Sequence, residues 1–144
     1  MLRISKLADY AIIIMSEMTR YTDTSCTAQQ LAQDTQISLP TVRKILKLLM
    51  KAELLHSTRG TQGGYYLAKP ADHTSLIDVI SAIDGPLAIT ECCHINKQCD
   101  RHACCQARSN WQMINQQIGR LLQSITIDQM RAPLPNLLDI NARS

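Results

Sequence analysis

Five of the six cysteines of this chain lie in one short stretch, ECCHINKQCDRHACC, which runs from Glu91 to Cys105. Two of its four histidines, His94 and His102, lie in the same stretch. Thiolate and imidazole groups are the donors that zinc and the iron of iron–sulfur clusters prefer. A nucleophilic cysteine would not need so many neighbouring thiols. The stretch therefore predicts a metal site.

The spacing of the cysteines leaves two sets of three ligands open. Neither set contains the paired Cys-x2-Cys knuckles that are typical of structural zinc. Spacing alone therefore does not separate zinc from an iron–sulfur cluster, and the two histidines are available as further ligands. One set is Cys93, Cys99 and Cys105, each six residues apart, and the other, less regular set is Cys92, Cys99 and Cys104.

Length and composition favour one small globular domain with appendages. The chain has 144 residues, of which 45% are apolar and only 3% aromatic, with no Phe, and this pattern favours a helical core. The N-terminus does not resemble a signal peptide, and no stretch reaches the ~18 apolar residues of a membrane span. We therefore expect a cytoplasmic protein without membrane association, whose thiols are reduced, so that metal ligation is favoured over disulfides. The net charge of +3 is too small to indicate a partner.

The first half of the chain has the pattern of a helix-turn-helix. Residues 5–19 have apolar side chains at helical spacing. Thr27 and Gln30 form a capping-box pattern that opens a short helix to about residue 34, and TQIS follows as a turn. Ser38 is then expected to cap a third helix that carries Pro40 in its first turn.

The third helix, PTVRKILKLLMKAE, is amphipathic and basic. Arg43, Lys44 and Lys47 fall within about 100° of one another on a helical projection, and apolar residues occupy most of the other side. Between Arg43 and Arg59 there are five basic residues and one acidic residue, a local net charge of +4. A solvated helix face would explain the pattern of one helix, but such a charge also suits contact with phosphates.

A glycine-rich hairpin follows the basic helix. LLHST and YYLAK read as short strands, and the turn between them, RGTQGG, carries Arg59 and Gly60. Two helices, a basic helix and a hairpin with a basic tip make a winged helix-turn-helix, in which the basic helix enters the major groove of DNA and the wing contacts the backbone or minor groove. A protein-binding winged helix is the alternative.

Two further helices are expected. In TSLIDVISAIDG, Ser75 and Asp78 form a second capping-box pattern, Gly85 ends the helix, and the isoleucines can pack on the winged-helix core. The last helix carries an apolar stripe with little of the same chain left to pack against, which predicts a dimer interface. The stripe consists of Trp111, Ile114, Ile118, Leu121, Leu122 and Ile125.

Four segments together resemble a known family: LRISKLADYA, SLPTVRKILKLL, RGTQGGYYLAKP, and the Cys-x5-Cys-x5-Cys run that ends six residues before Trp111. Over about residues 1–130 the chain resembles the iron–sulfur winged-helix transcriptional regulators of the IscR and NsrR type. DGPLAITEC and PTVRKILKLL are most similar to the branch that regulates the SUF cluster-assembly operon. The resemblance implies a repressor of SUF-type iron–sulfur assembly genes.

The resemblance also implies a ligand set. The family places a Trp six residues after its third cysteine, which selects Cys93, Cys99 and Cys105. In IscR-like members a His three residues after the third cysteine is the fourth ligand, but here that position is Arg108. In NsrR-like members an Asp of the first helix reaches across from the partner subunit, and Asp9 matches it. The implied fourth ligand is therefore Asp9, with His94 or His102 as alternatives.

The sequence thus predicts a mostly α fold with a small β-hairpin wing. We expect a winged helix-turn-helix over residues 1–84, a cluster-binding loop over 85–105, a dimerisation helix over 106–130 and a tail over 131–144. The expected protein is not an enzyme but a homodimer that holds a 2Fe–2S or 4Fe–4S cluster and binds a double-stranded DNA operator. A zinc-stabilised regulator and a redox or sulfur-carrier protein are the alternatives. The expected DNA-binding residues are Ser38, Pro40, Thr41, Arg43, Lys44 and Lys47 of the reading helix, with Arg59 and Gly60 of the wing.

Overall fold

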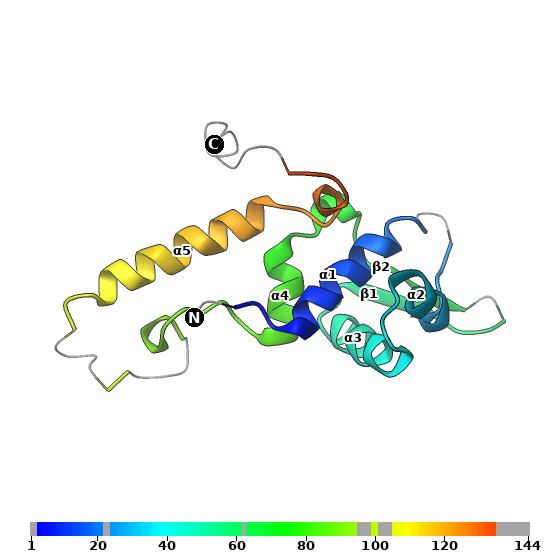
Figure 1. The fold of residues 1–144 in the computed structure, drawn as a ribbon, viewed down its shortest axis with the longest axis horizontal. Coiled ribbons are helices and arrows are strands. Elements are labelled where there is room, and N and C mark those ends of the chain that lie inside the picture. Colours follow the sequence, from blue (N-terminus) through cyan, green and yellow to red (C-terminus); the bar gives the residue numbers. More distant parts are fainter. Residues whose placement is uncertain (1–2, 22–23, 62, 95–98, 101–104, 135–144) are drawn as a thin grey trace.

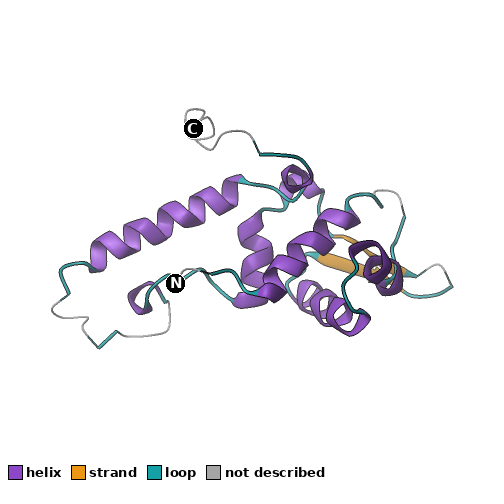
Figure 2. Cartoon of the chain, viewed as in Figure 1, coloured by secondary structure: helices purple, strands orange, loops and turns teal. Residues whose placement is uncertain are grey.

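The computed structural model describes residues 3–21, 24–61, 63–94, 99–100 and 105–134. Figure 1 shows α1 to α4 and the hairpin in one group, with α5 extending away from that group. Short 3-10 turns connect several of these elements (Figure 2). The helices are α1 (Lys6–Met18), α2 (Ala28–Thr35), α3 (Leu39–Lys51), α4 (Leu76–Asp84) and α5 (Arg108–Ser124), and the strands are β1 (Leu55–Thr58) and β2 (Gly64–Leu67).

Helix α1 lies in the middle of the core and packs against α2, α3 and α4. Its small residues Ala8 and Ala11 and its large residues Ile14 and Met15 are fully buried. Small side chains let the neighbouring helices approach, and each large one contributes about 1.5–3 kcal/mol on burial. The helical spacing predicted for residues 5–19 is therefore confirmed, with Ser5 as the N-cap.

The wing is a two-stranded antiparallel hairpin in which Leu55 lies opposite Leu67. A third segment joins its edge, because Cys26 and Tyr65 exchange both backbone hydrogen bonds, at 2.9 and 2.8 Å. Gly64 is required at this contact, since a Cβ there would lie 2.7 Å from the carbonyl oxygen of Cys26. The hairpin is thus fixed to the segment that leads into α2.

The helix ends agree with the sequence in most places. Both capping boxes form: Thr27 with Gln30 at α2, and Ser75 with Asp78 at α4. Gly85 ends α4 with a φ of 86°, a conformation that favours glycine. Ser38 differs, because it precedes α3 but its side chain caps no backbone N–H; its hydroxyl lies 2.8 Å from that of Thr41 instead.

Helix α4 joins the winged helix to α5. Its Leu76, Val79 and Ile80 are buried in the core. The next residue, Ile77, is half-buried, and its side chain lies beside Gly119 of α5. Helix α4 thus contacts α5 as well as α1 and α3.

Helix α5 is shorter than the expected helix over 106–130. It ends at Ser124, and the next residues turn back into the core, where Ile125 and Ile127 are buried. The backbone there pairs with the segment before α4: the N–H of Leu76 donates to Ile125, and the N–H of Ile127 donates to Thr74, both at 2.9 Å. The burial of these two isoleucines outside the helix accounts for the end of α5 at Ser124.

Candidate nucleic-acid interface and cysteine loop

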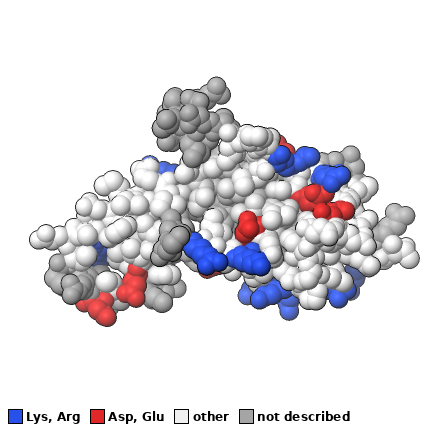
Figure 3. All heavy atoms as spheres, in the orientation of Figure 1, with Lys and Arg blue, Asp and Glu red and all other residues white. Residues whose placement is uncertain are grey.

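The basic face of α3 points to solvent. Arg43, Lys44 and Lys47 are exposed, whereas Val42 and Ile45 on the opposite side are fully buried. Lys and Arg side chains gather at the lower edge of the molecule in Figure 3, where Figure 1 places α3. The fold therefore presents a fixed row of positive charge, as the sequence predicts.

The N-terminus of α3 adds polar groups to this face. Ser38 and Pro40 are exposed, and Thr41 is half-buried. The contact between the hydroxyls of Ser38 and Thr41 leaves the first backbone N–H groups of the helix without a side-chain cap. Uncapped N–H groups at a helix start are donors that suit an anionic partner.

The wing and the start of α2 form one groove. A cavity of about 420 Å³ lies between them, lined by Thr27 and Ala28 on one side and by Arg59, Gly60 and Tyr65 among the wing residues. Arg59 and Gly60 are exposed at the tip, where Gly60 has a φ of 114°. Strand β1 also contacts α3, so the wing and the basic helix belong to one connected surface.

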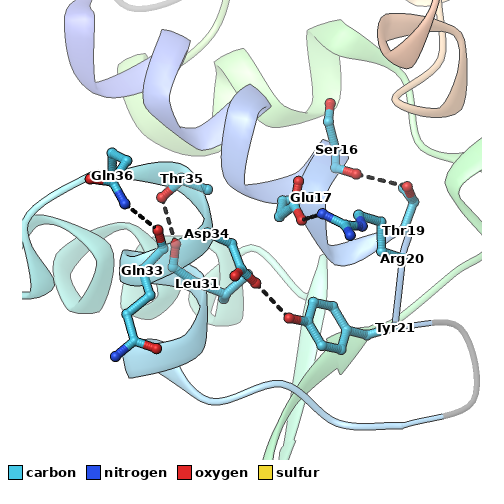
Figure 4. Close-up of polar contacts among 10 residues, drawn as sticks. All are labelled: Ser16, Glu17, Thr19, Arg20, Tyr21, Leu31, Gln33, Asp34, Thr35 and Gln36. Carbon is cyan, nitrogen blue, oxygen red and sulfur yellow. Dashed lines mark hydrogen bonds and ion pairs between the residues drawn. The ribbon is translucent and has the colours of Figure 1, made fainter.

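One polar contact joins the segment that follows α1 to α2, and the other contacts drawn with it are local (Figure 4). Tyr21 donates a hydrogen bond of 2.5 Å to the Asp34 carboxylate in the last turn of α2, and this bond raises the pKa of the Tyr21 phenol. Arg20 pairs with Glu17 at 2.6 Å, and the hydrogen bond to Glu17 raises the pKa of the Arg20 guanidinium. The Glu17–Arg20 pair has the i,i+3 spacing of a helical ion pair, whereas the Tyr21–Asp34 bond joins residues 13 positions apart and has no sequence motif.

The first predicted ligand, Cys93, ends a short 3-10 turn (Glu91–Cys93) that lies beside the first turn of α5. Its thiol donates to the carbonyl oxygen of Trp111 at 3.6 Å. The Thr90 hydroxyl lies 3.1 Å from the sulfur of Cys92 and 3.3 Å from that of Cys93. Thr90 is a residue that the sequence did not single out, and its hydroxyl is within hydrogen-bonding distance of both sulfurs.

The other predicted ligands are less closely placed. Cys99 is half-buried and Cys105 is exposed, and both are free thiols. His102 and Cys104 lie outside the described residues. Within the residues that the structure describes, no group of three or more Cys, His, Asp or Glu side chains lies close enough to hold a metal. A single chain therefore does not bring Cys93, Cys99 and Cys105 together in this structure.

The donors nevertheless fit an anionic metal centre in their chemistry. Cys93 and Cys105 both lie next to the first turn of α5, and so does Arg108, whose Nε is buried and has no hydrogen-bond partner within the described ranges. A buried guanidinium nitrogen without a partner suits a site that carries negative charge, such as several thiolates on iron. Arg108 occupies the position at which IscR-like proteins are expected to place a ligand histidine.

Asp9 is exposed in the first turn of α1. The helix start is fixed from α4, because the backbone N–H and the hydroxyl of Ser5 both donate to the Asp84 carboxylate, at 3.2 and 2.6 Å. Asp9 does not join the cysteines within one chain.

The sixth cysteine, Cys26, belongs to the core. It is fully buried between α2 and the wing, and its thiol donates to the carbonyl of Tyr65 at 3.4 Å. Burial raises the pKa of the Cys26 thiol to about 11. Among the residues that the structure describes, Cys26 belongs to no group of three or more Cys, His, Asp or Glu side chains that could hold a metal.

No helix in the described ranges is long and apolar enough to cross a membrane.

Comparison with known sequences identifies a family. The profile of the Rrf2 family, described as "Iron-dependent Transcriptional regulator", matches residues 4–133. Protein rrf2 of Nitratidesulfovibrio vulgaris is 35% identical over 104 residues, which cover 72% of this chain and 69% of that protein. The HTH-type transcriptional regulator IscR of Photobacterium profundum is 26% identical over 130 residues, which cover 90% of this chain and 75% of that protein.

Solved structures show the same fold. CymR, described as the global cysteine regulator of B. subtilis, superposes with a TM-score of 0.71 at 24% identity, covering 90% of this chain and 96% of that one. IscR of T. potens superposes with a TM-score of 0.69 at 21% identity, covering 96% of each chain. The expectation of a mostly helical winged-helix fold is confirmed, and these relatives are transcriptional regulators, not enzymes.

Proposed function

This chain belongs to the Rrf2 family of iron-dependent transcriptional regulators, and from that premise we propose that it is a dimeric repressor whose affinity for a DNA operator is set by an iron–sulfur cluster. The observation that carries the proposal is that one fold contains both a DNA-binding surface and a group of candidate metal ligands. One is the exposed basic face of α3, and the other is the set of free cysteines beside α5. The first part binds DNA, and the second makes binding depend on iron.

The reading surface consists of α3 and the wing. Arg43, Lys44 and Lys47 are exposed on one side of α3 and are the side chains for base edges and phosphates in the major groove. Ser38, Pro40 and Thr41 contact the groove wall from the start of the helix. Arg59 and Gly60 at the tip of the wing contact the backbone beside it, where positive charge and a small residue permit close approach.

The cluster is held by Cys93, Cys99 and Cys105, with Asp9 of the partner subunit as the fourth ligand and His94 or His102 as alternatives. When bound, a 2Fe–2S or 4Fe–4S cluster supplies iron that responds to oxidants or nitric oxide, most readily at a position with an oxygen ligand. Arg108 offsets the negative charge of the thiolates. Support comes from the free thiols, the buried Arg108 Nε and the iron-dependent family.

Asp9 couples the metal site to DNA binding. Helix α1, which carries Asp9, packs against α2, α3 and α4. A ligand on this helix therefore connects the metal site of one subunit to the winged helix of the other. When Asp9 dissociates from the metal, the two α3 helices of the dimer can move relative to each other. Such a switch has two sites and one element with two positions, as allosteric control requires.

The target genes are those of SUF-type iron–sulfur assembly. This part of the proposal depends on the resemblance of DGPLAITEC and PTVRKILKLL to the SUF-regulator branch. A repressor that loses its cluster when clusters are scarce would release the genes that make them.

Anaerobic purification tests the cofactor. We expect a coloured protein with visible absorbance, containing iron and acid-labile sulfide, that binds an operator duplex differently from the metal-free protein. A colourless protein with bound zinc would instead indicate a zinc-stabilised regulator, because zinc sites do not absorb visible light. Failure of both forms to bind any duplex would refute the regulator and favour a redox or sulfur-carrier role.

A further inference from the structure

The segment that leads to the first ligand cysteine is held along α5 by one asparagine. The side chain of Asn115 donates from Nδ2 to the carbonyl of Leu87 at 3.1 Å, and its Oδ1 accepts from the N–H of Ile89 at 3.0 Å. Both bonds have ordinary length for N–H···O contacts. The amide thus fixes two backbone groups that lie two residues apart.

The contact continues towards the cysteines. Gln112 donates to the carbonyl of Cys92 at 3.4 Å, and the Cys93 thiol donates to the carbonyl of Trp111 at 3.6 Å. Residues 111, 112 and 115 lie on neighbouring turns of one helix face, because side chains three and four residues apart are neighbours there. Residues 87–93 therefore run antiparallel to α5, from Asn115 at one end to Trp111 beside Cys93 at the other.

We propose that Asn115 is a positioning residue for the metal site. By fixing the segment that leads to Cys93, Asn115 holds the Cys93 thiol against α5 when no metal is bound. The inference rests on the proposed role of Cys93 as a cluster ligand. Asn115 makes two bonds of ordinary length, whereas the contacts of Gln112 and Cys93 are longer. The side chain is half-buried, so water competes less for these bonds.

Preorganisation is the consequence for the site. A ligand that is already in place loses less conformational freedom when metal binds, and this favours assembly and slows loss. Cys105 lies three residues before α5 and is exposed. We therefore infer that Cys93, and not Cys105, is the ligand that is held in place before the metal binds.

The test uses the reduced, metal-free chain and compares Asn115→Leu with Gln116→Leu. Both substitutions replace an amide by an apolar side chain on α5, but Gln116 is exposed and lies on a different side of the helix. In Asn115→Leu we expect hydrogen exchange at the Ile89 amide to be about tenfold faster, because its only side-chain acceptor is lost. Alkylation of Cys93 by iodoacetamide, resolved from Cys92 by fragmentation mass spectrometry, should also be several-fold faster.

Several internal comparisons separate positioning from general destabilisation. Exchange in α1 and alkylation of Cys105 should not change in Asn115→Leu, and Gln116→Leu should match the wild type throughout. Asn115→Asp keeps an acceptor for Ile89 but lacks the donor for Leu87, so its exchange and alkylation rates should lie between those of Leu and wild type. In protein loaded with the cluster, visible absorbance should decay faster under chelator in Asn115→Leu than in wild type.

Unchanged Ile89 exchange and Cys93 alkylation in Asn115→Leu would overturn the inference, whether or not a cluster binds. A parallel increase in α1 exchange in both Asn115→Leu and Asn115→Asp would also overturn it, because Asn115 would then be merely structural. Failure of the proposed function is a separate result, since it shows as absence of a cluster in the wild type. The metal-free measurements still decide the role of Asn115 in that case.

Discussion

Cys92 and Cys93 are adjacent, yet their thiols have different surroundings. Both sulfurs lie close to the Thr90 hydroxyl, but only the thiol of Cys93 also donates to the carbonyl of Trp111 on α5. Neighbouring side chains leave the backbone in different directions, so only one of the two can occupy a given ligand position. The contact with α5 agrees with the choice of Cys93 that the family resemblance implies.

Single alanine substitutions test this register. Cys93→Ala, Cys99→Ala and Cys105→Ala should each abolish the visible absorbance of anaerobically prepared protein, because a cluster needs each thiolate at a fixed position. Cys92→Ala is the matched control and should retain most of the absorbance. If Cys92 proves essential while Cys93 and Cys105 are dispensable, the ligand set is wrong.

The buried thiol of Cys26 predicts a loss of stability at high pH. In the unfolded chain this thiol loses its proton near the ordinary pKa of 9.0, but in the folded chain it keeps the proton until about pH 11. Between these values the folded state binds more protons than the unfolded state, so the free energy of unfolding falls as pH rises.

Urea denaturation of wild type and Cys26→Ala from pH 8 to 11 measures this effect. Other groups titrate in the same range in both proteins, so the difference between the two curves reports Cys26. We expect the wild type to lose more stability than Cys26→Ala over this range. Parallel curves for the two proteins would contradict the raised pKa.

At the scale of the helices, Thr27 and Ser38 precede α2 and α3 but have different roles. Thr27 accepts from the N–H of Gln30 at 3.1 Å within a capping box, whereas Ser38 caps no backbone group. Thr27→Ala should therefore lower the free energy of unfolding by about 1 kcal/mol. Ser38→Ala should cost clearly less. Chemical denaturation of both variants decides this, and equal losses would show that the hydroxyl of Ser38 stabilises α3 after all.

The basic face of α3 predicts two different effects on DNA binding. Lys47→Ala should weaken binding to all duplexes and reduce the slope of log K against log salt by about one unit, if it contacts one phosphate. Arg43→Ala should instead lose roughly 1–3 kcal/mol of discrimination at one base position, as expected for a guanine contact.

Fluorescence anisotropy with operator and scrambled duplexes, over a range of salt concentrations, measures both effects. Lys69→Ala is the control, because Lys69 is exposed and lines a separate cavity with Met18 and Asp128. Unchanged binding in both α3 variants would refute the assignment of this helix to the groove.

Some features of the fold could be predicted from the sequence, and others could not. The capping boxes of α2 and α4 depend on residues three positions apart, so their motifs were sufficient. The Asn115 bonds join residues 26 and 28 positions apart, and the bonds between Ser5 and Asp84 span 79 positions. No periodicity marks such contacts, because they exist only after the helices pack. Likewise, the end of α5 depends on the burial of Ile125 and Ile127 beside α4.

At the scale of the whole molecule, the two ends of α5 have different surroundings. Leu121 and Leu122 pack against the core of the same chain, but Trp111 is 42% exposed and Ile114 43% exposed. No residue of α5 is fully buried. The stripe predicted from the sequence is thus partly used within the chain, and its exposed end, next to the cysteines, is the part available to a second subunit.

The exposed end of α5 therefore carries the test of the dimer. Ile114→Glu should place a charge in the subunit interface without disturbing the core, and it should raise the dimer dissociation constant by roughly 100-fold or more. Leu121→Glu is less informative, because Leu121 also packs within its own subunit. Gln116→Glu adds the same charge at an exposed position of α5 and should leave the dimer intact.

Sedimentation velocity and binding to a two-site operator report the result. Ile114→Glu should sediment as a folded monomer, with an unchanged far-ultraviolet circular dichroism spectrum. Its affinity for a single half-site should be preserved, since α3 is untouched, while its affinity for the full operator should fall because two linked reading helices bind more tightly than one. A wild-type protein that sediments as a monomer, or an Ile114→Glu dimer as tight as wild type, would exclude this face of α5 as the interface.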